Sequence, residues 1–135
     1  MDKLVLILDD DLVYLNFMRS HFRQMGGYVV EAFSDGDELI KAMGTKNPFM
    51  AILDHNLSDP TKNGVHYLKQ IKKLRPTLPV IYITSEASDS LKREVLKLGV
   101  TVRIIKSESF LVHLRTAIDE IITPKKPGLL ARLFK

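Results

Sequence analysis

Short apolar runs alternate along the chain with longer stretches of helical period, and this alternation restricts the fold more than any other feature. The five apolar runs, each predicted to be a strand, are residues 4–8, 28–32, 49–53, 80–84 and 102–105. The five segments with apolar residues at three- and four-residue spacing, each predicted to be a helix, are residues 12–25, 35–43, 65–74, 88–98 and 108–122. The runs are mostly unalternating, which is typical of parallel strands buried on both faces.

Five successive strand-then-helix units predict one architecture. The fold class is α/β, a doubly wound five-stranded parallel sheet with helices on both faces and right-handed crossovers. In such folds ligands gather at the carboxyl ends of the strands. The residues that end the strands are therefore the first place to look for chemistry.

Composition fits one soluble domain. The chain has 135 residues, 45% of them hydrophobic and 27% charged, which is enough for a real core and favours neither disorder nor a membrane span. It has no cysteine, which excludes disulfides and thiolate zinc sites and suits a reducing cytoplasm. The first apolar run meets Asp9 too soon for a signal peptide. We therefore expect a cytoplasmic protein.

The net charge of +4 lies entirely in the last twelve residues. Residues 124–135 hold four basic side chains and no acidic one, so the rest of the chain is neutral overall and nucleic-acid binding is not expected. We divide the chain into a domain over 1–122, a Pro/Lys linker over 123–128 and a short basic amphipathic tail over 129–135. Such a tail suits contact with a protein or with a membrane surface.

The strand ends carry three carboxylates, a hydroxyl and an ammonium. Asp9 and Asp10 follow the first strand, Asp54 the third, Thr84 ends the fourth and Lys106 follows the fifth. Oxygen ligands in such a cluster suit Mg²⁺, which would relieve their mutual repulsion. Beside Mg²⁺, Asp54 could attack phosphorus while Lys106 neutralises the equatorial oxygens and Thr84 donates a hydrogen bond. The pattern thus predicts phosphoryl transfer onto Asp54.

The stretches LILDDD, FMAILD, VIYITSEA and IIKSES, in this order and spacing, resemble the receiver domain of two-component response regulators. The resemblance implies the CheY-like, flavodoxin-like (βα)5 fold with strand order 2-1-3-4-5. It implies that Asp54 is the phosphoacceptor and that Asp10 and Asp54 bind Mg²⁺ with the backbone carbonyl of Asn56. Asp9 would assist through water, and Asn56 and Glu86 would tune the rate at which water removes the phosphoryl group.

Four positions depart from the pattern of that family. Ser58 stands where a proline is usual, four residues after Asp54, and Gly64 lies further along than usual, which predicts a lengthened loop. Ser107 replaces the proline that follows the lysine, so the Lys106–Ser107 bond is either a strained cis bond or a trans bond that aims Lys106 differently. Arg103 replaces the aromatic residue of the switch, and we expect it to pair with a partner or an acidic neighbour.

We expect other polar residues to have structural rather than chemical roles. Asp11 is expected at a helix start and Ser107 as the cap of the last helix. The histidines show no zinc spacing and are expected to be structural or surface residues; they are His21, His55, His66 and His113.

The expected function is a stand-alone receiver rather than an enzyme acting on other substrates. It would accept a phosphoryl group from a histidine kinase or phosphotransfer protein and switch its contacts with an unknown downstream protein; homodimerisation stays open. One alternative is a receiver fold that has lost phosphorylation and works as an interaction module. Another is a haloacid-dehalogenase-like phosphohydrolase, because the stretch DDDLV fits that opening motif, although no acidic pair follows Lys106 at a strand end.

Overall fold

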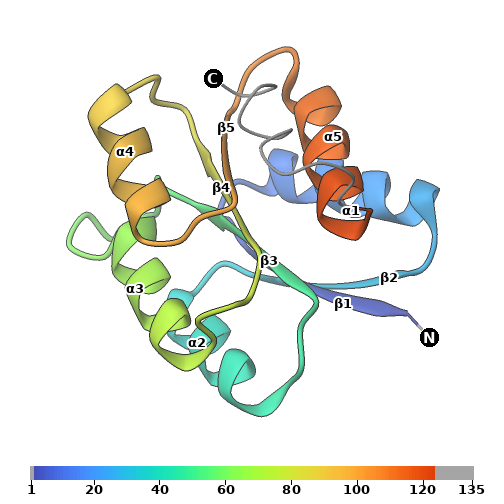
Figure 1. Ribbon diagram of the computed structural model, residues 1–135, viewed down its shortest axis with the longest axis horizontal. Coiled ribbons are helices and arrows are strands. Elements are labelled where there is room, and N and C mark those ends of the chain that lie inside the picture. The colour runs from blue at the N-terminus through green and yellow to red at the C-terminus, as the bar shows by residue number, and fades with distance from the viewer. Residues whose placement is uncertain (1, 124–135) are drawn as a thin grey trace.

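A computed structural model describes residues 2–123, and Figure 1 shows how its helices and strands are arranged. The strands are β1 (Lys3–Leu8), β2 (Tyr28–Phe33), β3 (Met50–Asp54), β4 (Val80–Thr84) and β5 (Val102–Ile105). The helices are α1 (Leu12–Met25), α2 (Gly36–Thr45), α3 (Gly64–Leu74), α4 (Asp89–Lys97) and α5 (Phe110–Ile122). The predicted tail and most of the predicted linker lie outside the described residues.

The five strands form one parallel sheet in the order β2-β1-β3-β4-β5, which confirms the predicted fold class and strand order. The order reverses between β1 and β3, so the residues that follow these two strands meet at one edge. The register pairs Leu8 with Leu53 there and places Asp54 beside Ile83 of β4. Asp9 and Asp54, 45 positions apart in the chain, therefore come together because of topology alone.

Each face of the sheet carries its own hydrophobic core. Helices α1 and α5 lie side by side over one face, and α2, α3 and α4 cover the other (Figure 1). Strand β1 shows how the sequence serves both cores, because Val5 and Ile7 pack under α1 and α5 while Leu6 and Leu8 pack under the other three helices. Burial on both faces explains why the strands are continuous apolar runs.

The start of the last helix differs from the prediction. Helix α5 begins at Phe110 with Ser109 as its N-cap, two residues later than expected, so the prediction that Ser107 caps it is wrong. The Phe110 amide donates to the Ser107 carbonyl at 3.1 Å, which closes a separate turn before the helix. This turn lets Phe110, only 3% exposed, pack edge-on against Tyr14. Burial of the ring outweighs the local capping preference.

The other element ends differ by at most two residues from the predicted ones, and each of helices α1 to α4 has a side-chain N-cap hydrogen bond. Asp11 precedes α1 and accepts a hydrogen bond from the Val13 amide at 3.0 Å, as expected of a helix-start residue. Asn63 accepts from the Val65 amide at the start of α3. Within residues 2–123, no helix is both long and apolar enough to cross a lipid bilayer.

Candidate functional site

Three carboxylates converge at the carboxyl edge of the sheet. One side-chain oxygen each of Asp9, Asp10 and Asp54 lies within 4.8 Å of the other two. Asp9 is 0% exposed and Asp54 1% exposed, whereas Asp10 is half-buried at the rim. The backbone amide of Asp11 donates to Asp9 at 2.9 Å and holds that side chain inward. Buried carboxylates this close repel one another strongly unless a cation lies among them.

Lys106 supplies one positive charge to this cluster from the other side of the site. Its Nζ lies 3.1 Å from Asp9 Oδ2 and 3.3 Å from Asp54 Oδ2, and its side chain is only 9% exposed. The Lys106 amide donates to the Thr84 carbonyl at 2.8 Å, which extends the β5 pairing and fixes the start of the side chain. The ammonium also lies over the Tyr14 ring, 4.4 Å from its centre. One lysine against three carboxylates leaves the site in need of further positive charge.

The pKa values of Asp54 and Lys106 both reflect this excess of negative charge. Burial, and next the negative charge of Asp9, raise the pKa of Asp54 from 3.8 to about 7, although Lys106 and a backbone hydrogen bond from Asn56 act in the opposite direction. Burial lowers the pKa of Lys106, but Asp54 and Asp9 outweigh it, so that pKa is raised and the ammonium stays charged. The three carboxylates can therefore carry more negative charge than the single Lys106 ammonium neutralises.

The chemistry of these donors fits a hard dication. Asp54 Oδ1 is buried and has no hydrogen-bond partner within residues 2–123. Three carboxylates with an unpartnered oxygen are the oxygen ligands that Mg²⁺ prefers. Asp9, Asp10 and Asp54 would hold the ion.

Thr84 lies beside the cluster but is turned to the backbone. The residue is 0% exposed at the end of β4, one position beyond Ile83, which pairs with Asp54. Its Oγ1 accepts a hydrogen bond from the Glu86 amide at 3.0 Å. The Glu86 side chain is exposed.

Comparison with known proteins identifies the family. The sequence model of the response regulator receiver domain matches residues 5–119. The chain belongs to the response regulator receiver family. The match covers all of β1 except its first two residues, the other four strands, all three carboxylates and Lys106, so the predicted resemblance to receivers is confirmed. Receivers act as phosphoacceptors in two-component signal transduction.

Curated relatives carry the receiver as one part of a longer protein. The alkaline phosphatase synthesis transcriptional regulatory protein PhoP of Bacillus subtilis is 28% identical over 99 residues, which are 73% of this chain and 40% of PhoP. The Regulator of RpoS of Escherichia coli K12 is 27% identical over 122 residues, 90% of this chain and 35% of the relative. The chain therefore spans about two fifths or less of these proteins.

Solved structures agree with the fold. A CheY-like receiver domain protein from Methanospirillum hungatei JF-1 is 25% identical with a TM-score of 0.79, covering 90% of this chain and 95% of that one. The receiver domain of the Francisella response regulator 1452 is 25% identical with a TM-score of 0.78, covering 93% and 100%. Strand order and helix placement in this receiver are therefore those of the family.

Asn56 joins two loops of the receiver site. Its side-chain oxygen accepts hydrogen bonds from the Ser85 hydroxyl at 3.1 Å and, more weakly, from the Ser85 amide at 3.4 Å. Ser85 directly follows Thr84, so this contact ties the loop after β3 to the loop after β4. Asn56 was predicted from the sequence as a site residue, but Ser85 was not. The only feature of the sequence that could have indicated Ser85 is its position directly after Thr84.

Ser58 contacts the cluster itself, which the sequence did not predict. The Ser58 amide donates to Asp10 Oδ2 at 2.7 Å, and the Ser58 hydroxyl donates to the same oxygen. Gly64, at the end of this loop, is required because a Cβ there would come within 2.5 Å of the Asp54 carbonyl oxygen. The loop therefore folds closely over the carboxyl edge of β3.

His55 is structural in this receiver, as expected for the histidines. Its Nδ1 lies 2.6 Å from the hydroxyl of the buried Tyr82, and its amide donates to the Ile83 carbonyl at 2.8 Å. Burial raises the pKa of Tyr82, so the phenol stays protonated and suits a hydrogen bond to the imidazole. The pair fixes the backbone directly after Asp54.

Arg103 is half-buried on β5, next to Tyr82 of β4. Its Nη1 donates weakly to the Glu86 carbonyl at 3.4 Å, and its Nε is buried without a partner in the described part of the chain. Burial lowers the pKa of Arg103 and Asp89 acts to raise it, but within residues 2–123 the guanidinium forms no ion pair. Instead of the ion pair with an acidic neighbour that the sequence suggested, Arg103 has a hydrogen bond to a backbone carbonyl in the described residues.

No peptide bond within residues 2–123 is cis, so the Lys106–Ser107 bond is trans.

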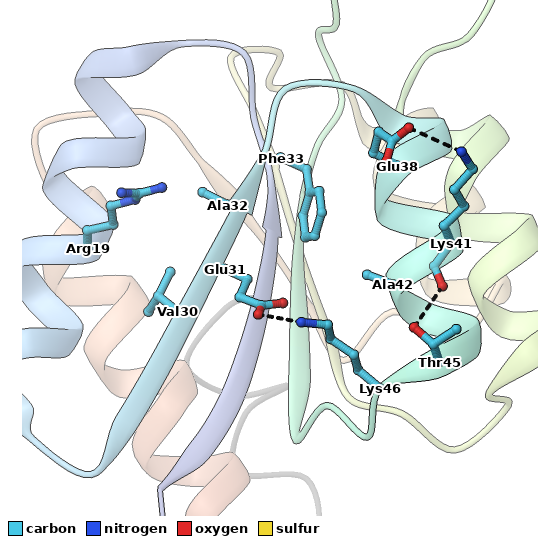
Figure 2. A pocket seen from close by; sticks show the side chains of 10 residues that line it. All are labelled: Arg19, Val30, Glu31, Ala32, Phe33, Glu38, Lys41, Ala42, Thr45 and Lys46. Atoms are coloured by element: carbon cyan, nitrogen blue, oxygen red, sulfur yellow. Dashed lines mark hydrogen bonds and ion pairs between the residues drawn. The ribbon is translucent and has the colours of Figure 1, made fainter.

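A groove of about 490 Å³ lies elsewhere on the receiver, along the edge strand β2 and against α2 (Figure 2). Two ion pairs line it: Glu31 with Lys46 at 2.6 Å and Glu38 with Lys41 at 3.3 Å. Their carboxylates already have basic partners, and none of the predicted site residues lines the groove. We assign it no part in the chemistry at Asp54.

Proposed function

We propose that this receiver accepts a phosphoryl group on Asp54, with Mg²⁺ required, from the phosphohistidine of a histidine kinase or phosphotransfer protein. The observation that carries the proposal is the placement of Asp54, buried close to Asp9 and Asp10 with the Lys106 ammonium 3.3 Å from its Oδ2. A lone carboxylate in a core would be costly, whereas this arrangement keeps an unpartnered oxygen available for reaction.

Mg²⁺, when bound, would neutralise charge on the oxygens of the transferring phosphoryl group. Asp10 and Asp54 would supply carboxylate ligands, with the Asn56 carbonyl, and Asp9 would assist through water. The half-buried position of Asp10 leaves this side of the cluster open to water and to a donor.

The chain's own residues divide the remaining work. An oxygen of Asp54 forms a bond to phosphorus as the bond between phosphorus and the donor's leaving nitrogen breaks. Lys106, held between Asp9 and Asp54, is placed to pair with a phosphoryl oxygen and stays charged because its pKa is raised. The Thr84 hydroxyl would leave the Glu86 amide and donate to another phosphoryl oxygen.

Two residues are proposed to tune the lifetime of the phosphoryl group. Asn56 is fixed by Ser85 near the mouth of the site, and the exposed Glu86 lies two residues after Thr84. Both could affect how water approaches phosphorus. Because the Glu86 amide bonds Thr84 and its carbonyl bonds Arg103, movement of Thr84 would also reach the surface of β5.

The output is proposed to be a change in contacts with another protein. The chemistry would be limited to the receiver's own phosphorylation and dephosphorylation. That the receiver works as a stand-alone module stays a prediction, as does contact of the tail with a protein or a membrane surface. The phosphorylation-independent interaction module stays the alternative, since Arg103 does not match the aromatic switch of the family.

Intact-protein mass spectrometry tests the proposal. The chain is incubated with acetyl phosphate, with Mg²⁺ or with EDTA, beside Asp54→Asn and the control Asp2→Asn, whose side chain is exposed. We expect one phosphoryl adduct in the wild type and the control with Mg²⁺, and none with EDTA or in Asp54→Asn. A folded wild type that never forms an adduct would favour the interaction module.

A further inference from the structure

The loop between β3 and α3 holds one of the three carboxylates by two hydrogen bonds. Ser58 donates from its amide to Asp10 Oδ2 at 2.7 Å and from its hydroxyl to the same oxygen. The two residues are 48 positions apart, so this is a long-range tie between the loop and the end of β1. Asp10 Oδ2 therefore already accepts two hydrogen bonds, which leaves Oδ1 as the less engaged oxygen.

We propose that Ser58 is a positioning residue that engages one Asp10 oxygen, leaves the other for a metal ion, and would thereby set the preference of the site for Mg²⁺ over Ca²⁺. This inference rests on the proposed function, in which Asp10 is a ligand. It concerns a residue outside the cluster, and at a position where this chain departs from its family.

The physical argument is the different demand of the two ions. Ca²⁺ takes six to eight oxygens and often binds a carboxylate through both of its oxygens. Mg²⁺ takes six in near-octahedral geometry, keeps several waters and needs only one oxygen from each carboxylate. With Oδ2 engaged by two donors, Asp10 offers one oxygen, which satisfies Mg²⁺ and deprives Ca²⁺ of a ligand.

The loop beyond Ser58 also has hydrogen bonds and an ion pair that do not involve the cluster. Asp59 accepts hydrogen bonds from the Thr61 amide at 2.9 Å and the Thr61 hydroxyl at 2.7 Å. Lys62 lies 3.8 Å from Asp37 of α2. Removal of a hydrogen-bond partner that orients a metal ligand, as Ser58 orients Asp10, commonly changes metal affinity by 10- to 100-fold.

Isothermal titration of the whole chain with Mg²⁺ and, separately, with Ca²⁺ tests the proposal. The variants are Ser58→Ala, which removes the hydroxyl donor, and Ser58→Thr, which retains one. The matched control is Thr61→Ala, which removes a hydroxyl hydrogen bond in the same loop that does not reach the cluster. Ser58→Ala keeps the amide bond to Asp10 Oδ2, so we expect the Kd for Mg²⁺ to rise by about tenfold, at the low end of that range, while the Kd for Ca²⁺ does not rise and the ratio of the two constants shifts by about tenfold. Ser58→Thr and Thr61→Ala should keep the wild-type ratio.

Four results would overturn the proposal. If the Kd values for Mg²⁺ and Ca²⁺ change equally in Ser58→Ala, the substitution has loosened the loop in general. If the ratio of the two Kd values shifts as much in Thr61→Ala as in Ser58→Ala, the same conclusion follows. An unchanged ratio with normal Mg²⁺ binding would refute the role of Ser58 and leave the proposed function intact. A wild type that binds neither ion at millimolar concentration would refute the metal site together with this inference.

Discussion

Replacing Asp54 by asparagine should stabilise the free protein, although it removes the residue proposed to do the chemistry. Burial, and next the charge of Asp9, raise the pKa of Asp54 from 3.8 to about 7, so ionised Asp54 is disfavoured in the folded state. Asparagine has nearly the same shape as the neutral acid and never ionises. Lys106 keeps Asp9 as a partner, 3.1 Å away, in the variant.

The size of the expected stabilisation follows from the ordinary and the raised pKa of Asp54. A rise from 3.8 to about 7 corresponds to about 4 kcal/mol, since one pKa unit equals about 1.4 kcal/mol. Water entry at the rim screens part of this cost, so we expect Asp54→Asn to raise the free energy of unfolding by about 2–4 kcal/mol at pH 8 without Mg²⁺.

The pH dependence has a definite sign. Between about pH 4 and pH 7 the folded wild type binds more protons at Asp54 than the unfolded chain does. Its stability relative to Asp54→Asn therefore falls as the pH rises through this window, and the difference is small near pH 4. Mg²⁺ at pH 8 should narrow the difference again, because it binds the folded wild type more tightly than the variant.

Urea unfolding followed by circular dichroism, with EDTA, measures the difference at several pH values. Asp2→Asn serves as the control, because it removes a carboxylate from an exposed position. An Asp54→Asn variant that is equally or less stable than the wild type at pH 8 would refute the reasoning. So would a gain in stability that does not depend on pH.

Three further substitutions test how the fold supports the site, each by urea unfolding. Gly64→Ala should destabilise the protein by about 1–3 kcal/mol, because the new Cβ would come within 2.5 Å of the Asp54 carbonyl and the Tyr82 hydroxyl; wild-type stability would show that the loop can shift freely. Asp11→Ala should cost about 1 kcal/mol through loss of the α1 cap, and Asp11→Asn should restore most of it; equal loss in both would argue against capping. Tyr82→Phe should cost about 1 kcal/mol because His55 loses its partner at 2.6 Å; an unchanged midpoint would mean that water replaces the phenol.

The fold and the main site could be predicted from the sequence because both depend on local patterns. Unalternating strands between amphipathic helices indicate a parallel sheet, and topology then brings Asp9, Asp10 and Asp54 to one edge. The start of α5 could not be predicted, because burial of Phe110 decides it and depends on a ring from α1.

The hydrogen bonds of Ser58 and Arg103 near the site could not be predicted from the sequence either. The bonds from Ser58 to Asp10 join residues 48 apart through a loop of irregular length, and no periodicity specifies where such a loop folds. Arg103 was expected to pair with a partner or an acidic neighbour, whereas its hydrogen bond within residues 2–123 goes to the carbonyl of Glu86, and backbone acceptors have no sequence signature. Side-chain identity indicates which groups need partners, whereas loop geometry decides which partners they meet.

The central claim is that Asp54 receives the phosphoryl group, and chemical trapping tests it most directly. An aspartyl phosphate is reduced by borohydride to homoserine, which peptide sequencing by mass spectrometry locates. After incubation with acetyl phosphate and Mg²⁺, homoserine should occur at position 54 and should disappear when EDTA replaces Mg²⁺. Homoserine at position 9, 10 or 11 instead, or a stable adduct that borohydride does not reduce, would contradict the account.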